Sequence, residues 1–315
     1  MRVAVVGAGI AGLVAARDLA AAGHAAVIVE KSRGLGGRMA ARRVGGTVVD
    51  HGLPVLEVPP GGAVAALVRE CAPGAVPLDG DAVAWPAGMT VLPKAMAAAV
   101  PAAGSVELLL DTRVAALRAG TQGIEVAQDQ GNTIGVFDAV VITAPAPQAV
   151  ELLEHSPEPG RAEALRAVQY DPAVMLLAGF AMDEPGWVAA RPNSGPVAYV
   201  TNEAVKGRPP VDGVVPVVAR LRPDASERLF DASDDVVLAE AIPAMRTVLG
   251  PGTPEPAWTQ VKRWRYCTAR SQVDQAMANP QGSRIIIAGD AVAPGPTVED
   301  VARTGEWAAR RLITG

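Results

Sequence analysis

A run of six residues near the start of the chain has the spacing of a site that could hold phosphate groups. Residues 7–12 read Gly-Ala-Gly-Ile-Ala-Gly, a G-x-G-x-x-G pattern, and a short valine-rich segment, Arg2 to Val6, precedes them. A segment rich in alanine and leucine follows as far as Ala22, and Gly23 is a suitable end for a helix. The pattern therefore predicts a buried strand, a tight turn and a helix, in that order.

Each glycine of this run has a physical role in such a turn. Gly7 permits the tight turn, Gly9 lets a bound group come close to the backbone, and Gly12 lets the helix pack on the strand. The first helical residues, Ile10 and Ala11, offer free N–H groups and the positive end of the helix dipole to a phosphate. We interpret residues 7–12 as the binding site for the pyrophosphate of a dinucleotide.

A carboxylate follows the second apolar segment. Ala26 to Val29 predicts a second parallel strand, and Glu30 comes directly after it, roughly 20 residues beyond the glycines. At that position a carboxylate accepts a hydrogen bond from a ribose hydroxyl. The strand, the helix, the second strand and the acid together indicate a Rossmann-like, NAD(P)-binding type of α/β domain.

The residues after Glu30 indicate which dinucleotide is bound. The segment from Lys31 to Arg38 contains the pair Gly36-Gly37 directly before the arginine, and it resembles the signature of flavoproteins of the amine oxidase type. That resemblance implies FAD, with the glycines close to the cofactor and Arg38 near its phosphates and ribose. A permanently charged, forked guanidinium suits that place.

The composition excludes several other classes of site. The chain has 315 residues, 50% of them hydrophobic and 19% charged, so it can form about two domains with large cores. A net charge of −5 argues against a nucleic-acid partner. The two cysteines and three histidines are scattered, which excludes a disulfide framework and makes a metal site unexpected. Charged residues interrupt the apolar N-terminus, so we expect no membrane span and a cytoplasmic protein.

The order of the remaining elements predicts an α/β fold of two domains. We expect a Rossmann-like FAD-binding domain of residues 1–52, 86–155 and 279–315. An α+β substrate domain of residues 53–85 and 156–278, built on an antiparallel sheet, is inserted into it. The expected strands are 106–110, 114–118, 123–128, 138–143, 170–181, 197–201, 214–221, 257–266 and 284–288, and the expected helices are 63–70, 91–100, 148–155, 234–249 and 297–312.

Over nearly its whole length, the chain resembles the renalase family of FAD-dependent oxidoreductases, a branch of the amine oxidase superfamily. The likeness rests on several short motifs that occur in the same order along the chain. They are Glu30 to Met39, Pro86 to Met89, Ala144 to Ala149, Tyr170-Asp171-Pro172, Arg263 to Tyr266, Gly289-Asp290, Val298-Glu299 and Gly305.

This resemblance implies further contacts with FAD. Gly88 and Met89 would lie against the isoalloxazine ring, the backbone of Val114 would bracket the adenine, and Asp290 would hold the ribityl chain. The helix start at 297–299 would face the pyrimidine end of the flavin, where a helix dipole stabilises negative charge on the reduced ring. No Ser-Gly-Gly-Cys run for covalent flavin attachment occurs, so we expect non-covalent binding. The further expected contacts are Gly52, Pro86, Gly88, Met89, Val114, Ala144, Pro145, Trp264, Gly289, Asp290, Thr297, Val298 and Glu299.

Two places depart from the family pattern. Residues 50–55 replace a Gln-Tyr-Phe run of the relatives, and the segment up to residue 85 is rich in proline, so this wall of the pocket is rebuilt. Asp300 stands where the closing helix usually has a glycine. Its carboxylate either faces the flavin or points outward as an acid of the first helical turn, and we favour the outward orientation.

Five side chains are candidates for contact with the substrate. Trp264 and Tyr266 are two residues apart on an expected strand and so share a face, which is either an aromatic wall beside the flavin or part of the core. Tyr199 and Lys206 match a family segment on the substrate side, although Lys206 is equally well interpreted as a solvated lysine. His51 follows the acid of the early loop and either reaches the flavin or substrate or is structural.

We therefore expect an FAD-dependent oxidoreductase that accepts a hydride from a small-molecule donor and passes electrons to O2. No residue is a compelling acid or base, and hydride transfer from a dihydronicotinamide needs little proton transfer. This favours a dihydronicotinamide isomer as donor and a nicotinamide dinucleotide as partner. An amine oxidase or an apolar-substrate desaturase of the same superfamily is the first alternative. A flavin-binding protein without turnover, its pocket closed by Leu53 and Pro54, is the second.

Overall fold

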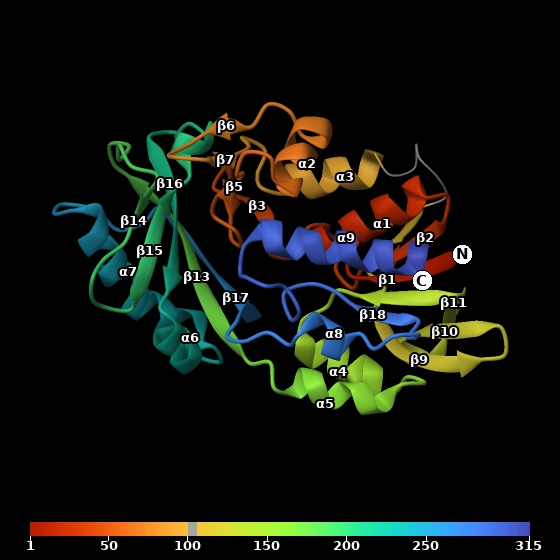
Figure 1. The fold of residues 1–315 in the computed structure, drawn as a ribbon. Helices are drawn as coiled ribbons and strands as arrows, with labels where there is room; N and C mark the ends of the chain where they lie inside the picture. The colour runs from red at the N-terminus through yellow and green to blue at the C-terminus, as the bar shows by residue number, and fades with distance from the viewer. Residues whose placement is uncertain (100–105) are drawn as a thin grey trace.

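The first lobe of the protein is built on a five-stranded parallel sheet. A computed structural model describes residues 1–99 and 106–315, which form two lobes side by side (Figure 1). In the first lobe the strand order is β18-β12-β1-β2-β8, and every neighbouring pair is parallel. The bounds are β1 Arg2–Val6, β2 Ala25–Val29, β8 Val106–Leu109, β12 Ala139–Ile142 and β18 Ile285–Ile287.

Alternate residues of this sheet enter two different cores. Val3 and Val5 pack with the helices on one face, whereas Ala4 and Val6 pack with the elements on the other. Strands buried on both faces must be apolar at every position, which explains the continuous run 3–6. The first face carries α1 Ile10–Ala21, α2 Ala63–Cys71, α3 Val91–Ala99 and α9 Val298–Thr314 (Figure 1).

The second face is covered by a small sheet and two helices. The sheet has the order β11-β10-β9 and is antiparallel throughout. Its strands are β9 Val114–Gly120, β10 Gly123–Gln128 and β11 Thr133–Phe137, and the helices are α4 Ala146–Glu154 and α5 Ala162–Arg166. Ala278, the last residue of the short helix α8 Gln275–Ala278, belongs to the same core.

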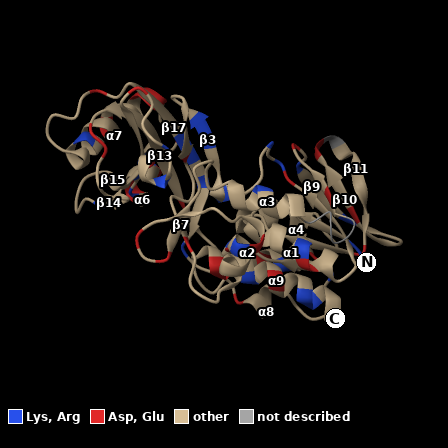
Figure 2. Ribbon diagram, turned by 90° about the horizontal axis from the view of Figure 1, so that it is seen from above, with Lys and Arg blue, Asp and Glu red and all other residues tan. Residues whose placement is uncertain are grey.

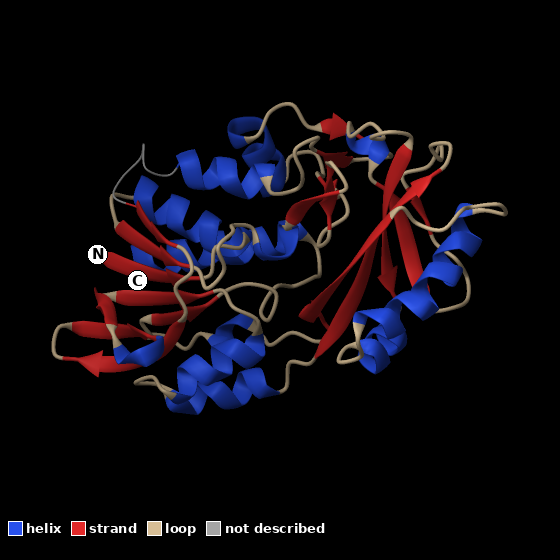
Figure 3. Cartoon of the chain, turned by 180° about the vertical axis from the view of Figure 1, so that it is seen from behind, coloured by secondary structure: helices blue, strands red, loops and turns tan. Residues whose placement is uncertain are grey.

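The second lobe is an antiparallel sheet with helices on its outer side. The strand order is β14-β15-β16-β13-β17, so β17 forms one edge. Figure 3 shows the helices α6 and α7 on the side of this sheet that is turned away from the first lobe. The bounds are β13 Tyr170–Ala181, β14 Ala189–Ala190, β15 Val197–Asn202, β16 Val214–Leu221, β17 Trp258–Ala269, α6 Pro223–Leu229 and α7 Asp234–Leu249.

Short strands between residues 41 and 84 connect the two lobes. A hairpin of β3 Ala41–Val44 and β4 Thr47–Asp50 places Val49 in a cluster with Met175 and Leu177 of the second lobe. Three further strands, β5 Leu56–Glu57, β6 Val76–Pro77 and β7 Ala82–Ala84, form a separate small sheet.

The predicted fold class is confirmed, because a Rossmann-like sheet and an antiparallel substrate-side sheet are both present. The boundaries of the lobes are different from the expected ones. Residues 53–85 pack in the same core as α1 and α9, and α5 packs on the parallel sheet. Both therefore belong to the first lobe by their packing, since each buries its apolar face there.

The individual elements agree with the sequence at most positions. The exceptions, which the sequence did not predict, are the hairpin of β3 and β4, the short strands β5, β6, β7 and β14, the strand β11 and the helices α5, α6 and α8. The predicted end of the helix 91–100, at Val100, lies outside the described residues. Among the described residues, no helix is long and apolar enough to cross a membrane, and no three His, Cys, Asp or Glu side chains are grouped to hold a metal ion.

Candidate active site

The turn after β1 leaves room for a ligand at one glycine and none at the others. Gly7 has a φ of +107°, and a Cβ atom on it would lie 2.6 Å from the Thr143 hydroxyl oxygen. A Cβ on Gly12 would lie 2.0 Å from the carbonyl oxygen of Gly7. A Cβ on Gly9 would meet no heavy atom within 4 Å. The backbone at Gly9 is therefore open to an approaching group, as the G-x-G-x-x-G pattern requires.

The helix that starts at this turn has no acceptor of its own for its first N–H groups. Gly9 is the N-cap of α1, and no side chain caps the helix. The N–H groups of Ile10 and Ala11 have no partner within a helix by its geometry. An open backbone beside an uncapped, buried helix start fits a pyrophosphate, and these residues could hold that part of FAD.

Glu30 is fixed by two backbone amides. Its Oε2 accepts a hydrogen bond from Ala8 N at 2.9 Å, its Oε1 accepts one from Ser32 N at 2.8 Å, and the side chain is buried. A carboxylate has about four acceptor positions, so two remain for a ribose.

A pocket of ≈ 570 Å³ lies beside Glu30 and could hold the adenosine end of a dinucleotide. Val114, the residue expected at the adenine, is buried at the start of β9 next to this pocket. A hollow of ≈ 830 Å³ around Met1 and Trp307 lies at the amino-terminal ends of the parallel strands, away from the phosphate turn at their carboxyl ends. The smaller pocket is lined by Lys31, Ser32, Asp111, Arg113, Gln128 and Asp129.

The glycine pair Gly36-Gly37 lies against the turn of residues 7–12, the expected phosphate site. Gly36 has a φ of +100° and donates its N–H to Ala8 O at 2.9 Å, and a Cβ on Gly37 would be 3.7 Å from the Cα of Gly9. Gly52 approaches the same loop closely, because a Cβ there would be 2.0 Å from the carbonyl oxygen of Arg38. The sequence pattern Gly-Gly-Arg therefore brings three backbone segments together around the expected cofactor.

Arg38 and Asp290 form an ion pair with a distance of 2.6 Å between Nη1 and Oδ2. Arg38 also donates to the carbonyl oxygen of Cys267 on β17, at 3.0 Å, and so links the two lobes. The Tyr170 hydroxyl donates to Asp290 Oδ1 at 3.0 Å, and burial and the neighbouring carboxylate raise the pKa of this tyrosine. Sequence reasoning missed this role of Tyr170, although the motif that contains it was recognised.

Four charged side chains form a buried charge cluster, Asp50, Glu203, Lys206 and Arg208, each at most 3% exposed. The Lys206 Nζ lies 3.1 Å from Asp50 Oδ2 and 2.6 Å from Glu203 Oε1. Arg208 pairs with the same two carboxylates, at 2.7 Å from Asp50 Oδ2. Two acids and two bases give the cluster no net formal charge, which is the condition for burying charges at tolerable cost.

This cluster also holds the loop expected beneath the flavin. Asp50 Oδ1 accepts the N–H of Met89 at 2.9 Å, and Arg208 Nε donates to Pro86 O at 3.2 Å. Gly88 packs on the hairpin of β3 and β4, and the Met89 side chain is fully buried in the core. Any contact of these residues with a flavin would therefore come from the backbone or from the exposed Pro86.

Lys206 has a structural environment. Its side chain is fully buried and both of its ionic contacts are with carboxylates of the buried charge cluster. The expectation that Lys206 lines the substrate pocket therefore has no geometric support, and neither does its interpretation as a solvated lysine. The signal that could have found this role is the pair Glu203 and Lys206, three residues apart with Asp50 as a distant partner.

His51 and Trp264 stack on each other although they are far apart in the sequence. Their ring centroids are 5.6 Å apart with an interplanar angle of 18°, and Trp264 Nε1 donates to His51 O at 2.6 Å. His51 is 5% exposed, and its buried Nδ1 has no partner among the described residues. Burial first, and then the charges of Arg42 and Lys262, lower the pKa of His51 to about 4, so the ring is neutral at pH 7.

Tyr266 and Tyr199 lie on the same side of the second sheet as Trp264. Tyr266 contacts Tyr170 edge to face, with centroids 5.6 Å apart, and Tyr199 is buried beside Arg220. Arg263, on the opposite face of β17, pairs with Asp234 of α7 at 2.6 Å. The aromatic side chains of β17 thus face the first lobe, as the alternation of a strand requires.

The first turn of α9 is capped by side chains of the helix itself. Thr297 and Asp300 form a capping box, in which each side chain accepts the other's backbone N–H. Asp300 therefore acts as an acid of the first helical turn, and its orientation relative to a flavin stays a prediction. Glu299 accepts the N–H groups of Ala63 and Val64 at 2.9 and 2.8 Å, so it caps α2.

The remaining expected contacts lie at the ends of the parallel strands. Ala144 and Pro145 follow β12, with Pro145 as the N-cap of α4. Gly289, with a φ of +98°, follows β18 and donates its N–H to the Thr304 hydroxyl at 2.8 Å, and Val298 is the first residue of α9. Ala144, Pro145 and Gly289 therefore lie at the carboxyl ends of the strands, as the phosphate turn does, since the strands are parallel.

We predict that Lys206→Met lowers the free energy of unfolding by about 3–5 kcal/mol, because it leaves a buried carboxylate without its cation. Urea denaturation measures the change, and Lys94→Met, at an exposed lysine of α3, is the matched control. A variant as stable as the wild type that has lost only its activity would instead assign Lys206 to catalysis.

We also predict that His51→Phe removes part of the pH dependence of stability between pH 4 and 6.5. The unfolded chain binds a proton at His51 below pH 6.5 and the folded chain only below about 4. Stability therefore rises with pH across this window, by about 3 kcal/mol for this residue. Denaturation at pH 4.5 and 7 measures the difference. An unchanged slope in His51→Phe would contradict the assignment.

Two family patterns cover almost the whole chain. Residues 5–71 match the NAD(P)-binding Rossmann-like domain, and residues 72–313 match the flavin containing amine oxidoreductase family. The second match alone spans more than half of the chain.

Two curated proteins are similar to parts of the chain. One is the coproporphyrinogen III oxidase of Propionibacterium freudenreichii subsp. freudenreichii, 33% identical over 172 residues, or 51% of this chain and 30% of that protein. The other is the 4,4'-diapophytoene desaturase of Staphylococcus haemolyticus (strain JCSC1435), 48% identical over 59 residues, or 19% of this chain and 12% of that protein. The chain thus spans less than a third of the length of the curated relatives that it matches.

A solved structure shares the complete fold. Putrescine oxidase bound to putrescine matches 100% of both chains with a TM-score of 0.78, at 15% sequence identity. At this identity the likeness concerns the fold alone. FAD as cofactor and FAD-dependent oxidoreductase as enzyme class, both predicted from the sequence, are those of the matched family. The chain belongs to the flavin-containing amine oxidoreductase family.

Proposed function

We propose that the chain is an FAD-dependent oxidase that takes a hydride from a small organic donor held against the β17 face of the second lobe, with O2 as acceptor. The observation that carries this proposal is the tie between the two lobes at Arg38. The guanidinium that follows the glycine pair bonds both Asp290 of the first lobe and β17 of the second. This link supports a single site that contains both the residues expected to hold FAD and the Trp264–His51 stack.

The first lobe supplies the residues that would hold FAD without a covalent bond. Gly9 and the start of α1 would receive the pyrophosphate, Glu30 the ribose, and Arg38 with Asp290 the ribityl and phosphate region. When bound, FAD supplies a two-electron acceptor that can pass its electrons on to a second acceptor. The protein's own part is to orient the donor and to exclude water from it.

The side chains expected around the substrate offer orientation rather than acid–base chemistry. His51 is neutral at pH 7 because its pKa is about 4, and Lys206 is committed to the buried charge cluster. Hydride transfer from a dihydropyridine needs little proton transfer, whereas an amine or alcohol would need a base. This supports the finer likeness to renalase-type oxidases and a dihydronicotinamide isomer as donor.

In the alternative without turnover, Leu53 would help to close the substrate pocket. It packs against the core of the first lobe with α1 and α9, so the described structure gives no support to a pocket closed by this side chain. The names of the relatives suggest other donors, a porphyrinogen, a polyene or an amine, and each is a candidate in the same test.

The test is reduction of the flavin by candidate donors in the absence of O2, monitored through the flavin absorbance. We expect bleaching by dihydronicotinamide isomers and reoxidation when O2 is admitted. Reduction by putrescine, a polyene or a porphyrinogen alone would replace the donor in the proposal. Purified protein that takes up no FAD, or a bound flavin that no donor reduces, would overturn the proposal.

Glu30→Gln should weaken FAD binding roughly 10- to 100-fold, because it removes a charged acceptor that an amide can replace only in part. Titration of the apoprotein with FAD, followed by flavin fluorescence, gives the affinity. Glu107→Gln, at an exposed acid on the neighbouring strand β8, is the control and should bind FAD like the wild type. Equal affinities for both variants would remove Glu30 from the site.

Trp264→Ala should slow flavin reduction roughly 10- to 100-fold while FAD remains bound, because the donor loses the surface that orients it. Stopped-flow reduction and the ratio of flavin to protein are measured together. Trp187→Ala removes a half-buried tryptophan from the helical side of the same lobe and serves as the control. Loss of FAD or unfolding in Trp264→Ala would show that the side chain is only part of the core.

A further inference from the structure

Three cationic side chains lie where the second sheet faces the hairpin of β3 and β4. Met175 of β13 pairs with Lys262 of β17 on one side and with Arg220 of β16 on the other. Residues directly opposite each other in a sheet share a face. The two cations therefore flank Met175, which belongs to the cluster that packs on Val49 of the first lobe.

Arg42 adds a third cation from the hairpin of β3 and β4. It is opposite Val49 in the hairpin and donates to Gln260 Oε1 at 2.9 Å. Gln260 and Lys262 are two residues apart on β17 and share a face, so Arg42 lies on the same side of this strand as Lys262. Burial and the charge of Arg42 lower the pKa of Lys262. We call Arg42, Lys262 and Arg220 the cationic wall.

The cationic wall has no acid to neutralise it among the described residues. Within 4 Å, no carboxylate pairs with any of its three members. Their contacts include the neutral Gln260, the hydroxyls of Thr268 and Tyr199 and the ring of Trp264. The outer face of the same lobe is different. There the cations are paired with acids, as in Arg263–Asp234, Arg265–Asp231 and Arg228–Glu240.

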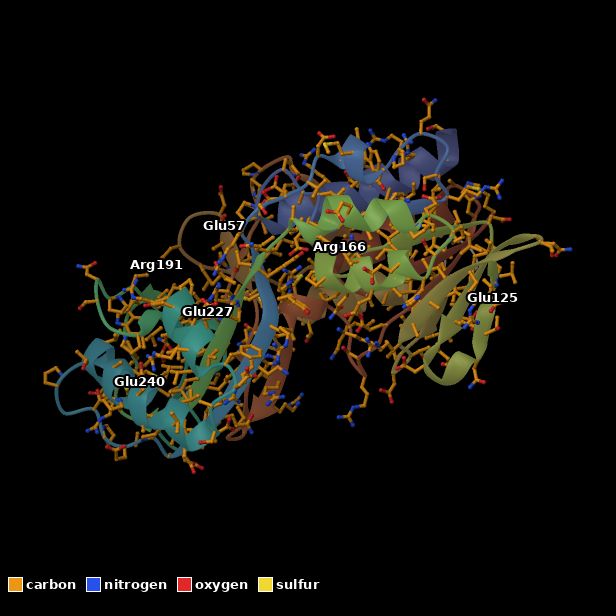
Figure 4. The ribbon with its side chains drawn as sticks, turned by 90° about the horizontal axis from the view of Figure 1, so that it is seen from below. Glu57, Glu125, Arg166, Arg191, Glu227 and Glu240 are labelled. Atoms are coloured by element: carbon orange, nitrogen blue, oxygen red, sulfur yellow. The ribbon has the colours of Figure 1, made fainter. Side chains whose placement is uncertain are left out.

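The charged positions of this lobe can be followed in two views. Figure 2 shows blue segments of Lys and Arg on β3 and β17 and red segments of Asp and Glu near α7. Figure 4 labels Glu227 and Glu240 on the helical side of the lobe, away from the first lobe. Unpaired, partly buried cations repel one another, so an arrangement of three favours a ligand that brings negative charge.

We propose that the cationic wall binds the acidic groups of the substrate, so that the hydride donor is an organic anion. This inference rests on the proposed function and names the substrate class of the same site. The wall stands beside the Trp264–His51 stack, because Lys262 Nζ lies 5.3 Å from the centroid of the Trp264 ring. A planar donor on that stack can thus place acidic groups on Lys262 and, about 10 Å away across two strand spacings, on Arg220.

The shared chemistry is a carboxylate or a phosphate, since both accept hydrogen bonds from guanidinium and ammonium groups. An amine substrate carries a positive charge at pH 7 and would be repelled by the wall. An uncharged polyene would gain nothing from it.

The test is equilibrium binding to the FAD-loaded protein by calorimetry, with the flavin absorbance as a second signal. Three probes are compared: a porphyrin with four carboxylates, nicotinamide mononucleotide and putrescine. We expect one of the two anions to bind, to perturb the flavin spectrum and to bind more weakly as salt is raised, while putrescine does not bind. Binding of the porphyrin assigns the wall to carboxylates, and binding of the mononucleotide assigns it to phosphates.

Lys262→Met and Arg220→Met should each weaken binding of that anion roughly 10-fold, since each removes one charged contact. Arg265→Met removes a cation from the opposite face of β17 and should bind like the wild type. Lys262 is only half-buried on an edge strand, so this variant tests the inference even if Arg220→Met does not fold.

Two outcomes would overturn the inference. One is equal anion binding in Lys262→Met and Arg265→Met, and the other is tighter binding of putrescine than of either anion. Both outcomes are measured with protein that has retained FAD. A wild-type protein without FAD would contradict the proposed function before any probe is added, so the two failures are distinguishable.

Discussion

The contact between the lobes depends on four buried charges that neutralise one another. Asp50 ends a strand of the first lobe, whereas Glu203, Lys206 and Arg208 come from a short segment of the second. In a medium of low polarizability, charges attract strongly, and each one left alone is very unfavourable. The arrangement therefore tolerates little relative movement, and a rigid junction is expected instead of a hinge. The N–H of Met89 is held by the same acid, so the loop under the expected flavin shares this rigidity.

The residues expected to hold the cofactor could be predicted from the sequence because the constraints on them come from neighbouring residues of the chain. Gly7 and Gly12 must be glycine since a side chain would collide with atoms that are fixed by the same strand, turn and helix. Glu30 is recognisable because a strand of known length ends directly before it. Signals of this kind need no knowledge of the rest of the chain.

The substrate side could be predicted only in part, because its contacts join residues that are far apart in the sequence. Lys206 is 156 positions from Asp50 and His51 is 213 positions from Trp264, and no spacing rule connects them. The hairpin of β3 and β4 was missed because Arg42 and Arg43 put a charged side chain on each of its faces, and because the hairpin packs on another lobe. The orientation of β17 was predictable, since alternation alone puts Trp264 and Tyr266 on one face.

The position of β17 at the edge of its sheet has a consequence for how this protein could diverge. Its outward arginines are tied to acids of neighbouring segments, so they preserve the lobe when the other face changes. The inward side chains at positions 260, 262 and 264 belong to one strand with a single neighbour in the ladder. Descendants could exchange them one at a time without rebuilding the sheet. Selection for a different substrate would then act on these three alternating positions of β17, while the lobe that holds the cofactor stays unchanged.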